Sequence, residues 1–368
     1  MSTNPVGHNT RNLGIDLLRI VSMLMVVILH ILGQGGILKA AKPLSAGYEI
    51  AWFLEILCYC AVNCYALISG YVGVSARFKY SNIVYIWLQV FFYSAGIAAV
   101  AAAISPDINI NAVIRGFFPV TTNFYWYFTA YFCIFFFIPL FNRVINSLNE
   151  KQLKATGITV FIIFSVLQIF AGSEIFFTNR GYSALWLALL YILGGILKKT
   201  EWLKNLKGYT LALLFFGVCA ITWFEKFIVE SINEMGLTEK ALGNSLVSYI
   251  SPTILLAAVF LLVAFSKIKT SNVGAKLIAF LAPFSFGVYL IHVHKQIWRH
   301  LMKNGFTYFA ELHWAVLPLA VIGSAVAIFI VCALVDFLRD KLFKVLKIKE
   351  LLIKAETKLI GDLWSQKN

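Results

Sequence analysis

Long apolar runs, separated by short polar stretches, organise almost the whole chain. Ten of them are candidates for membrane-spanning helices, because about 20 mostly apolar residues cross the hydrocarbon layer. They lie at roughly 13–34, 51–72, 82–104, 124–142, 157–172, 184–197, 209–225, 247–266, 278–297 and 315–336. A lipid-exposed backbone must satisfy its polar groups internally, so each run is expected to be helical. The pattern predicts an all-α integral membrane protein with about ten transmembrane helices.

Composition and charge agree with this pattern. The chain is 60% hydrophobic and 13% charged, with a mean hydropathy of +0.81, far from the usual soluble composition. Its net charge of +14 lies mostly in short loops between apolar runs, which favours a role in topology and lipid contact over a nucleic-acid partner. The six cysteines fall in apolar runs without zinc-like spacing, so we expect no metal site.

The basic residues also predict the orientation. Of the 31 Lys and Arg residues, 21 fall in the tails and loops of one side and nine on the other side, with Arg19 inside the first run. The positive-inside rule then places both termini in the cytoplasm and makes the chain a multi-pass protein of the cell membrane. The tail DFLRDKLFKVLKIKELLIKAETKLIGDLW is basic and amphipathic, and we expect it to lie on the cytoplasmic leaflet. We therefore divide the chain into a multi-span domain, 1–338, and an amphipathic tail, 339–368.

The first apolar run, GIDLLRIVSMLMVVILHI at 14–31, contains Asp16, Arg19 and His30. His30 follows Arg19 by eleven residues, which is about three helical turns, so the two side chains share one face about 16 Å apart. Asp16 precedes Arg19 by three residues and can pair with it. Ionisable residues at membrane depth usually face a cavity and mark a pathway or site. The alternative is that Arg19 snorkels to the interface and His30 bonds to a neighbouring helix.

The chemistry of this pair favours a transferase. A guanidinium suits phosphate, and a histidine of near-neutral pKa can take a proton from a hydroxyl nucleophile. The pair describes a phosphate-bearing donor that enters from the cytoplasm and an alcohol acceptor that meets it within the membrane. A transporter or flippase for a glycolipid or a proton-coupled solute, with the three ionisable residues as its relay, is the alternative. The two halves of the chain show no clear repeat, which weighs against that alternative.

Three further motifs are SGY at 69–71, FYWYFTAYF at 124–132 and SFGVYLIH at 285–292. Together with the Arg and His of the first of ten spans, they make the chain resemble the membrane-bound acyltransferase family 3, in particular bacterial O-acetyltransferases of polysaccharides and glycolipids. The resemblance implies transfer of an acyl group, most often acetyl, from acyl-CoA as co-substrate to a hydroxyl of a cell-surface glycan or glycolipid, without a bound cofactor. By position, His30 would be the catalytic histidine and Arg19 the arginine that orients CoA. His30 would act as a general base or form a transient acyl-histidine.

Other residues are candidates for binding the substrate or CoA. They are Asp16, Asn63, Ser69, Tyr71, Arg77, Lys79, Trp126, Tyr127 and His292. Arg77 and Lys79 lie in the loop VGVSARFKYSN, which lacks the paired arginines that many family members have there, and they are candidates for the CoA phosphates.

Each candidate also has a structural interpretation. The SGY motif can serve helix packing through its glycine, and Trp126 and Tyr127 can belong to an interfacial aromatic belt. His292 lies at a depth similar to that of His30, where it can line the acceptor side of a cavity or face the interface. Glu55, at the outer end of the second span, is expected to reach the interface.

Overall fold

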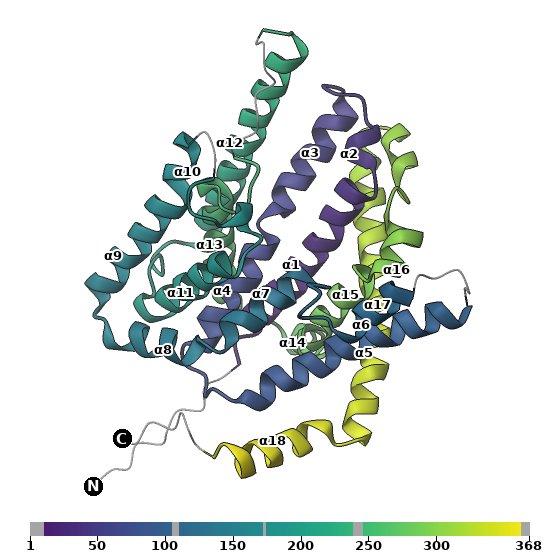
Figure 1. Ribbon diagram of the computed structural model, residues 1–368. Coiled ribbons are helices and arrows are strands. Elements are labelled where there is room, and N and C mark those ends of the chain that lie inside the picture. The colour runs from purple at the N-terminus through teal and green to yellow at the C-terminus, as the bar shows by residue number, and fades with distance from the viewer. Residues whose placement is uncertain (1–10, 105–109, 172–173, 238–245, 362–368) are drawn as a thin grey trace.

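The computed structural model describes residues 11–104, 110–171, 174–237 and 246–361, and these residues form helices and loops with no strand (Figure 1). The first half contains α1 (Leu13–Leu29), η1 (His30–Gln34), α2 (Ile37–Ala40), α3 (Ala46–Tyr59), α4 (Ala61–Gly73), α5 (Tyr80–Ile104), α6 (Ile110–Phe117), α7 (Trp126–Phe135), α8 (Ile138–Ser147), α9 (Glu150–Phe161), η2 (Ile162–Val166) and α10 (Leu167–Phe170). The second half contains η3 (Asn179–Gly181), α11 (Ala184–Thr200), α12 (Gly208–Glu234), α13 (Pro252–Ser266), α14 (Asn272–Leu281), η4 (Ala282–Phe284), α15 (Ser285–His292), α16 (Lys295–Ile297), η5 (Trp298–Met302), η6 (Thr307–Glu311), α17 (Leu317–Val345) and α18 (Ile348–Leu359).

Each of the ten predicted segments contains a helix. Within the described residues, seven helical stretches are long and apolar enough to cross a membrane, and α7 with α8, bent by 59°, forms an eighth candidate. The segments 184–197 and 247–266 correspond to the shorter helices α11 and α13, of 17 and 15 residues. The predicted all-helical membrane fold is confirmed, with seven to eight candidate spans and two shorter helices in place of ten full-length spans.

Polar residues start several of these helices by accepting a hydrogen bond from the first turn. Asn12 accepts from the backbone N–H of Ile15 at the start of α1, and Asn149 forms a capping box with Gln152 at the start of α9. Serines do the same at the starts of α3, α11, α13 and α14. Because a helix leaves its first N–H groups unpaired, these caps fix where each apolar run becomes helical.

Loops predicted to be cytoplasmic meet at one end of the structure. There the Asn12 amide donates to the Ser266 carbonyl over 2.9 Å, and Lys267 Nζ donates to the carbonyl of Lys204 over 2.7 Å. We call this the Asp16 end. At the opposite end, the Glu49 end, Glu49 of α3 pairs with Lys226 of α12 at 3.2 Å. The cytoplasmic location of the Asp16 end stays a prediction.

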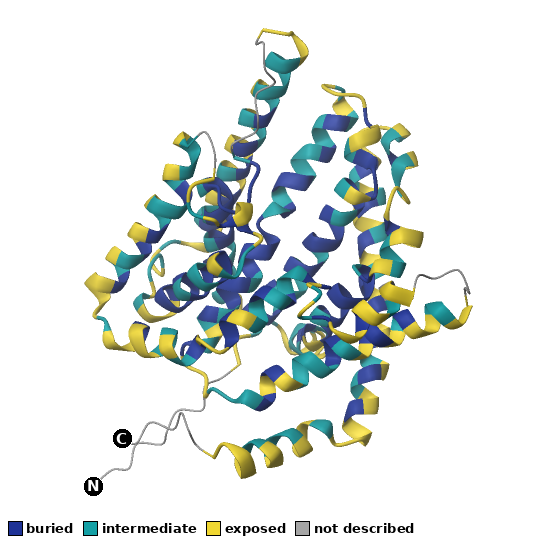
Figure 2. Cartoon of the chain, in the orientation of Figure 1, coloured by how far each residue is buried: buried dark blue, intermediate teal, exposed yellow. Residues whose placement is uncertain are grey.

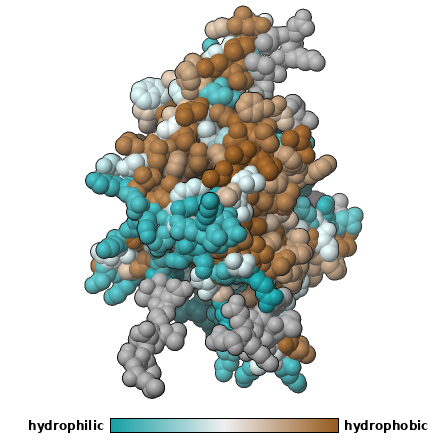
Figure 3. Space-filling view, turned by 90° about the vertical axis from the view of Figure 1, so that its left-hand side faces the viewer, coloured by the Kyte–Doolittle hydropathy of each residue, from teal (hydrophilic) through white to brown (hydrophobic). Residues whose placement is uncertain are grey.

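Helix α1 lies in the centre of the bundle, and α12 lies at its edge (Figure 2). Over the 18 most apolar consecutive residues of each helical stretch, 67% are buried in the stretch that begins with α1, whereas only 22% are buried in α12. Small residues allow the central helices to touch, since a Cβ added at Gly70 of α4 would lie 1.8 Å from the Tyr191 carbonyl oxygen of α11. The outward surface is left to lipid: on the face in Figure 3, hydrophobic residues cover most of the upper part, and hydrophilic residues gather lower down.

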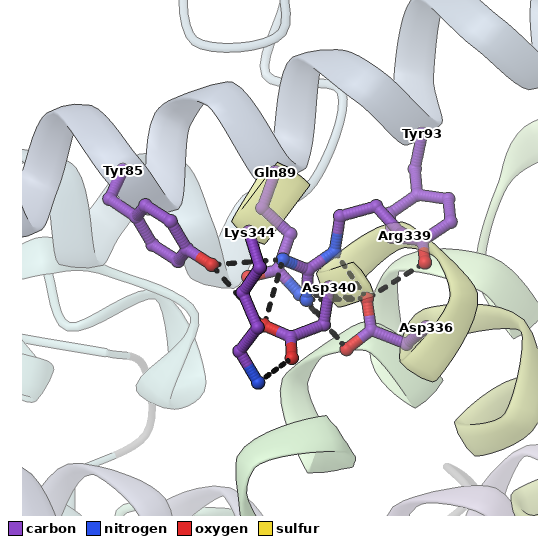
Figure 4. A network of polar contacts seen from close by, with 7 residues as sticks. All are labelled: Tyr85, Gln89, Tyr93, Asp336, Arg339, Asp340 and Lys344. Atoms are coloured by element: carbon purple, nitrogen blue, oxygen red, sulfur yellow. Dashed lines mark hydrogen bonds and ion pairs between the residues drawn. The ribbon is translucent and has the colours of Figure 1, made fainter. Parts of the chain in front are cut away.

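A buried polar network joins α5 and α17 (Figure 4), and α15 packs closely against it. The Asp336 carboxylate accepts hydrogen bonds from the Tyr93 hydroxyl at 2.8 Å and from the Gln89 amide at 3.1 Å. Arg339 donates to the same carboxylate through Nε and Nη2, both at 2.9 Å. A Cβ added at Gly287 of α15 would lie 2.1 Å from Asp336 Cγ. Because a buried charge is tolerated only when it is paired and hydrogen-bonded, the network fixes how these three helices pack.

The predicted amphipathic tail contains α18, which lies across the Asp16 end (Figure 1). The carboxylate of Glu356 accepts from the backbone N–H groups of Tyr80 and Ser81 at 2.6 and 3.3 Å, and so caps the start of α5. Helix α17 continues through the predicted domain boundary at 338–339 to Val345. Residues 1–10 of the predicted domain and 362–368 of the tail lie outside the described residues.

Candidate active site

Arg19 of α1 and His30, the first residue of η1, lie along one face of this continuous helical stretch, as their spacing predicts. Met23 and Val26, between them on this face, line a small cavity of about 70 Å³ together with His30. Arg19 instead lines a pocket of about 290 Å³ at the Asp16 end. One helix therefore connects two separate hollows.

The pocket at the Asp16 end is basic. Arg11, Arg19 and Lys198 line it, together with the carboxylate of Asp16. Asp16 is buried and pairs with both arginines, and its Oδ1 lies 2.5 Å from Arg19 Nη1. The Arg19 side chain remains 32% exposed, so it can still contact a ligand in the pocket. Three cations around one carboxylate leave an excess of positive charge, which suits an anion such as a phosphate. We call this hollow the basic pocket.

His30 is hydrogen-bonded to His292 of α15. Nδ1 of His30 lies 2.9 Å from Nε2 of His292, and Nδ1 of His292 lies 2.6 Å from the carbonyl oxygen of Val288. A carbonyl oxygen only accepts, so His292 donates its Nδ1 proton to Val288, and in the neutral ring its Nε2 accepts from His30. His30 then carries its proton on Nδ1. The lone pair on Nε2 of His30 is left to take a proton from another group.

The backbone at His30 departs from a regular α-helix. Residues His30–Gln34 form a π-helical turn, in which the N–H of Gly35 donates to the carbonyl of His30 over 2.7 Å. Such widened turns are common at functional sites. The Trp298 ring meets the imidazole edge-on, with centroids 4.9 Å apart. The His30 imidazole is thus held by the Trp298 ring and by its hydrogen bond to His292.

His30 also lines a larger cavity of about 540 Å³, which we call the His30 cavity. Most of its wall is aromatic, from Tyr59, Phe124, Tyr125, Trp126, Tyr182, Tyr249, Tyr289 and Trp298. Glu55, Gln34 and Lys295 add polar groups. Lys295 follows the α14–α15 span, and desolvation together with the nearby charge of Arg115 lowers its pKa below the usual value. A concave, largely aromatic site with a few polar groups is typical of a small-molecule or sugar site.

Tyr65 lies between Arg19 and the small cavity beside His30. Its hydroxyl donates to the carbonyl oxygen of Arg19 over 2.9 Å, and its ring lines the small cavity beside His30. The same ring meets Tyr127 edge-on at 6.3 Å between centroids. His30 and Trp126 line both the small cavity and the His30 cavity. A ligand group in the small cavity beside Tyr65 therefore also lies close to the His30 cavity.

The comparison with protein families matches residues 12–336 to the acyltransferase 3 family, described as an acyltransferase domain. The chain belongs to this family. The match runs from the residue that caps α1 to Asp336 of α17 and includes both histidines of the pair. The comparisons with curated proteins and with solved structures found no match. The protein is therefore a multi-pass membrane acyltransferase, which favours the transferase interpretation over the transporter.

Several other predicted residues line the hollows of this acyltransferase. Trp126 and Tyr127 both line the small cavity, and Trp126 also lines the His30 cavity. Tyr71 lines the basic pocket, with Lys198 Nζ 5.1 Å from the centre of its ring. The aromatic pair at the start of α7 therefore faces inward.

The other predicted binding residues of α4 and the loop after it do not line the small cavity, the His30 cavity or the basic pocket. Asn63 is fully buried: its amide donates to the Tyr249 carbonyl at 2.7 Å, and its oxygen accepts from Trp186 Nε1 at 3.0 Å. Ser69 donates to the Tyr65 carbonyl in its own helix at 3.0 Å. Arg77, which is exposed, and Lys79, which is partly buried, lie in the loop between α4 and α5.

The prediction that Glu55 reaches the interface is wrong. Helix α3 begins at Ala46, before the predicted start near residue 51, so Glu55 lies well inside the helix. Its side chain is buried and lines the His30 cavity. Tyr249 and Trp298 were also missed, because they belong to segments far from α1 in the sequence and no local motif marks them. Within the described residues, no three His, Cys, Asp or Glu side chains are grouped closely enough to hold a metal ion.

Proposed function

We propose that this acyltransferase transfers an acetyl group from acetyl-CoA to a hydroxyl of a cell-surface glycan or glycolipid, in the cell membrane. One observation carries the proposal. A hydrogen-bonded histidine with a free ring nitrogen faces a sugar-sized aromatic cavity, on the same helix face as a basic pocket. The His30 cavity suits an alcohol acceptor, and the basic pocket suits a phosphate-bearing donor.

The basic pocket would bind CoA. Arg19 and Arg11 would contact its phosphates, and Asp16 would hold the two guanidinium groups in place through its ion pairs. Tyr71 forms part of the same pocket wall. Arg77 and Lys79, from the loop after α4, would add contacts to the phosphates. Ser69 would stabilise α4 next to Tyr65, because its hydroxyl donates to the Tyr65 carbonyl.

His30 would act as the general base in the His30 cavity. Nε2 takes the proton of the acceptor hydroxyl as that oxygen attacks the thioester carbonyl carbon. The carbon–sulfur bond then breaks, the CoA thiolate leaves, and it takes the proton from His30. In the covalent variant, Nε2 itself attacks the thioester and forms an acetyl-histidine, which the acceptor hydroxyl then cleaves.

Neighbouring residues would position the reactants. His292 holds His30 in the tautomer that frees Nε2. Trp126 and Tyr127 offer ring faces to the acceptor beside His30. Asn63 would act through the cavity wall, because its amide holds the backbone of Tyr249 in place.

The test uses protein purified in detergent with radiolabelled acetyl-CoA. We expect wild-type protein to release CoA over time when supplied with glycan extract. His30→Ala should lower this rate by about 10²- to 10⁴-fold, the usual contribution of general-base catalysis. Label on the wild-type protein itself would support the covalent variant. Near-normal turnover by His30→Ala would refute the assignment of His30.

A further inference from the structure

Glu55 of α3 is the one acidic side chain among the described residues that line the His30 cavity. It is 8% exposed, and its Oε1 would lie 3.9 Å from a Cβ added at Gly33, in the turn that begins at His30. The carboxyl group therefore faces the cavity from a helix other than α1.

The Glu55 carboxyl group is left without a protein partner at one oxygen. Oε2 is buried, and among the described residues it has no hydrogen-bond partner. The two other acids that are buried among the described residues are paired, since Asp16 contacts two arginines and Asp336 contacts Arg339. An unsatisfied carboxyl group inside a membrane protein is costly, so its presence calls for a ligand that completes its hydrogen bonds.

The surroundings of Glu55 suit a sugar ring. Tyr59, Tyr249 and Tyr182 form a row of rings in the cavity wall, with neighbouring centroids 5.0 Å apart. Trp126 continues this row, with its ring 4.7 Å from that of Tyr182. A carboxylate accepts hydrogen bonds from hydroxyl groups, and aromatic side chains offer flat apolar faces beside polar edges. A sugar presents hydroxyl groups at its edge and C–H groups on its face, and so matches both.

We propose that Glu55 binds the acceptor by accepting hydrogen bonds from hydroxyl groups next to the one that is acylated. This inference rests on the proposed function, because it assigns a residue to the acceptor side of the same cavity. Glu55 would orient the sugar so that a chosen hydroxyl meets Nε2 of His30. It would thereby select which hydroxyl is acylated, while the donor binds without it at the Asp16 end.

The first test measures glycan acylation in cells of the source organism from which the gene is deleted. Complementation with the wild-type gene should restore base-releasable acetate on the cell-surface glycans, and His30→Ala should not. Glu55→Ala should restore little, and Glu55→Gln, which keeps the shape and one acceptor oxygen, an intermediate amount. If wild type restores no acetate, the proposed function fails. If wild type and Glu55→Ala restore equal amounts, the function stands and the role of Glu55 is overturned.

The second test separates the acceptor from the donor with purified protein, radiolabelled acetyl-CoA and glycan extracted from the deletion strain. Loss of one of the two acceptor oxygens should raise the apparent KM for the extract about tenfold in Glu55→Gln. The KM for acetyl-CoA should stay within about twofold of wild type. A rise in the KM for acetyl-CoA alone would place Glu55 on the donor side and overturn the proposal.

Matched controls keep this result interpretable. Glu150→Gln makes the same chemical change at an exposed residue that starts α9 and pairs with Lys154 on the surface. It should behave as wild type in both assays. Gel filtration in detergent should show the same elution volume for both Glu55 variants and wild type. A Glu55→Gln protein that elutes as wild type and keeps the wild-type KM for the extract would also overturn the proposal.

Discussion

Nε2 of His292 accepts a hydrogen bond from Nδ1 of His30 over 2.9 Å, although 262 positions separate the two residues in the chain. His292 is itself held by the carbonyl oxygen of Val288, one turn earlier in α15. This chain of two hydrogen bonds runs in one direction, because its last member can only accept. It makes His292 a positioning residue and fixes which nitrogen of His30 faces the substrates.

Replacing His292 should therefore slow the reaction more than it weakens donor binding. His292→Phe leaves the Nδ1 proton of His30 without an acceptor, and we expect kcat to fall about 10- to 100-fold at an unchanged KM for acetyl-CoA. His292→Gln, whose amide oxygen can accept, should recover part of the loss. Steady-state CoA release gives both constants. His300→Gln, at an exposed histidine of η5, is the control, and equal kcat in all three variants would contradict the positioning role.

Arg19→Gln should have the opposite kinetic signature. It removes a guanidinium from the basic pocket and leaves His30 and its partner unchanged. Loss of a charge-assisted contact to phosphate should raise the KM for acetyl-CoA about 10- to 100-fold, with a smaller effect on kcat. Titration with acetyl-CoA measures the change, and Arg143→Gln, at an exposed arginine of α8, controls for the lost surface charge. An unchanged KM would place the donor elsewhere.

Gly287→Ala should destabilise the protein. The added Cβ would lie 2.1 Å from Cγ of Asp336, so α15 and α17 must separate or the carboxylate must leave its partners. The expected result is a lower midpoint of thermal unfolding in detergent, together with lost activity, because α15 carries His292. Gly323→Ala on α17 meets no atom within 4 Å and is the matched control, expected to be neutral or slightly stabilising. Equal midpoints for the two variants would show that the close contact is not required.

Asp336→Asn should be the most destabilising change in the polar network of Figure 4. It removes the closer of the two carboxylates that pair with the buried guanidinium of Arg339 and leaves Asp340 at 3.9 Å, and breaking a buried ion pair typically costs about 3–5 kcal/mol. Thermal or denaturant unfolding in detergent would measure the loss. Replacing both residues by apolar ones of similar size, as Asp336→Leu with Arg339→Met, should recover much of it, because no unpaired charge then remains. A double variant as unstable as the single one would argue against charge as the cause.

The sequence predicts what depends on helical periodicity. Ten apolar runs mark the helices, and the eleven-residue spacing places Arg19 and His30 on one face of α1, where the structure has them. It does not predict which helices meet. The partner of His30 lies on α15, and the orientation of Glu55 depends on where α3 starts and on its rotation against α1. An apolar run has the same composition whether it faces lipid or protein. No local sequence pattern therefore marks the His30–His292 contact or the inward orientation of Glu55.

The small cavity between Met23 and Val26 has a volume of about 70 Å³, room for only a few water molecules. It adjoins the His30 cavity at His30 and Trp126, and among the described residues it shares no lining residue with the basic pocket. Along α1, the side chains between Arg19 and Met23 therefore separate the basic pocket from the small cavity beside His30. On the proposed function, a thioester that reaches His30 from the basic pocket must pass these side chains, so delivery of the acyl group requires them to move aside.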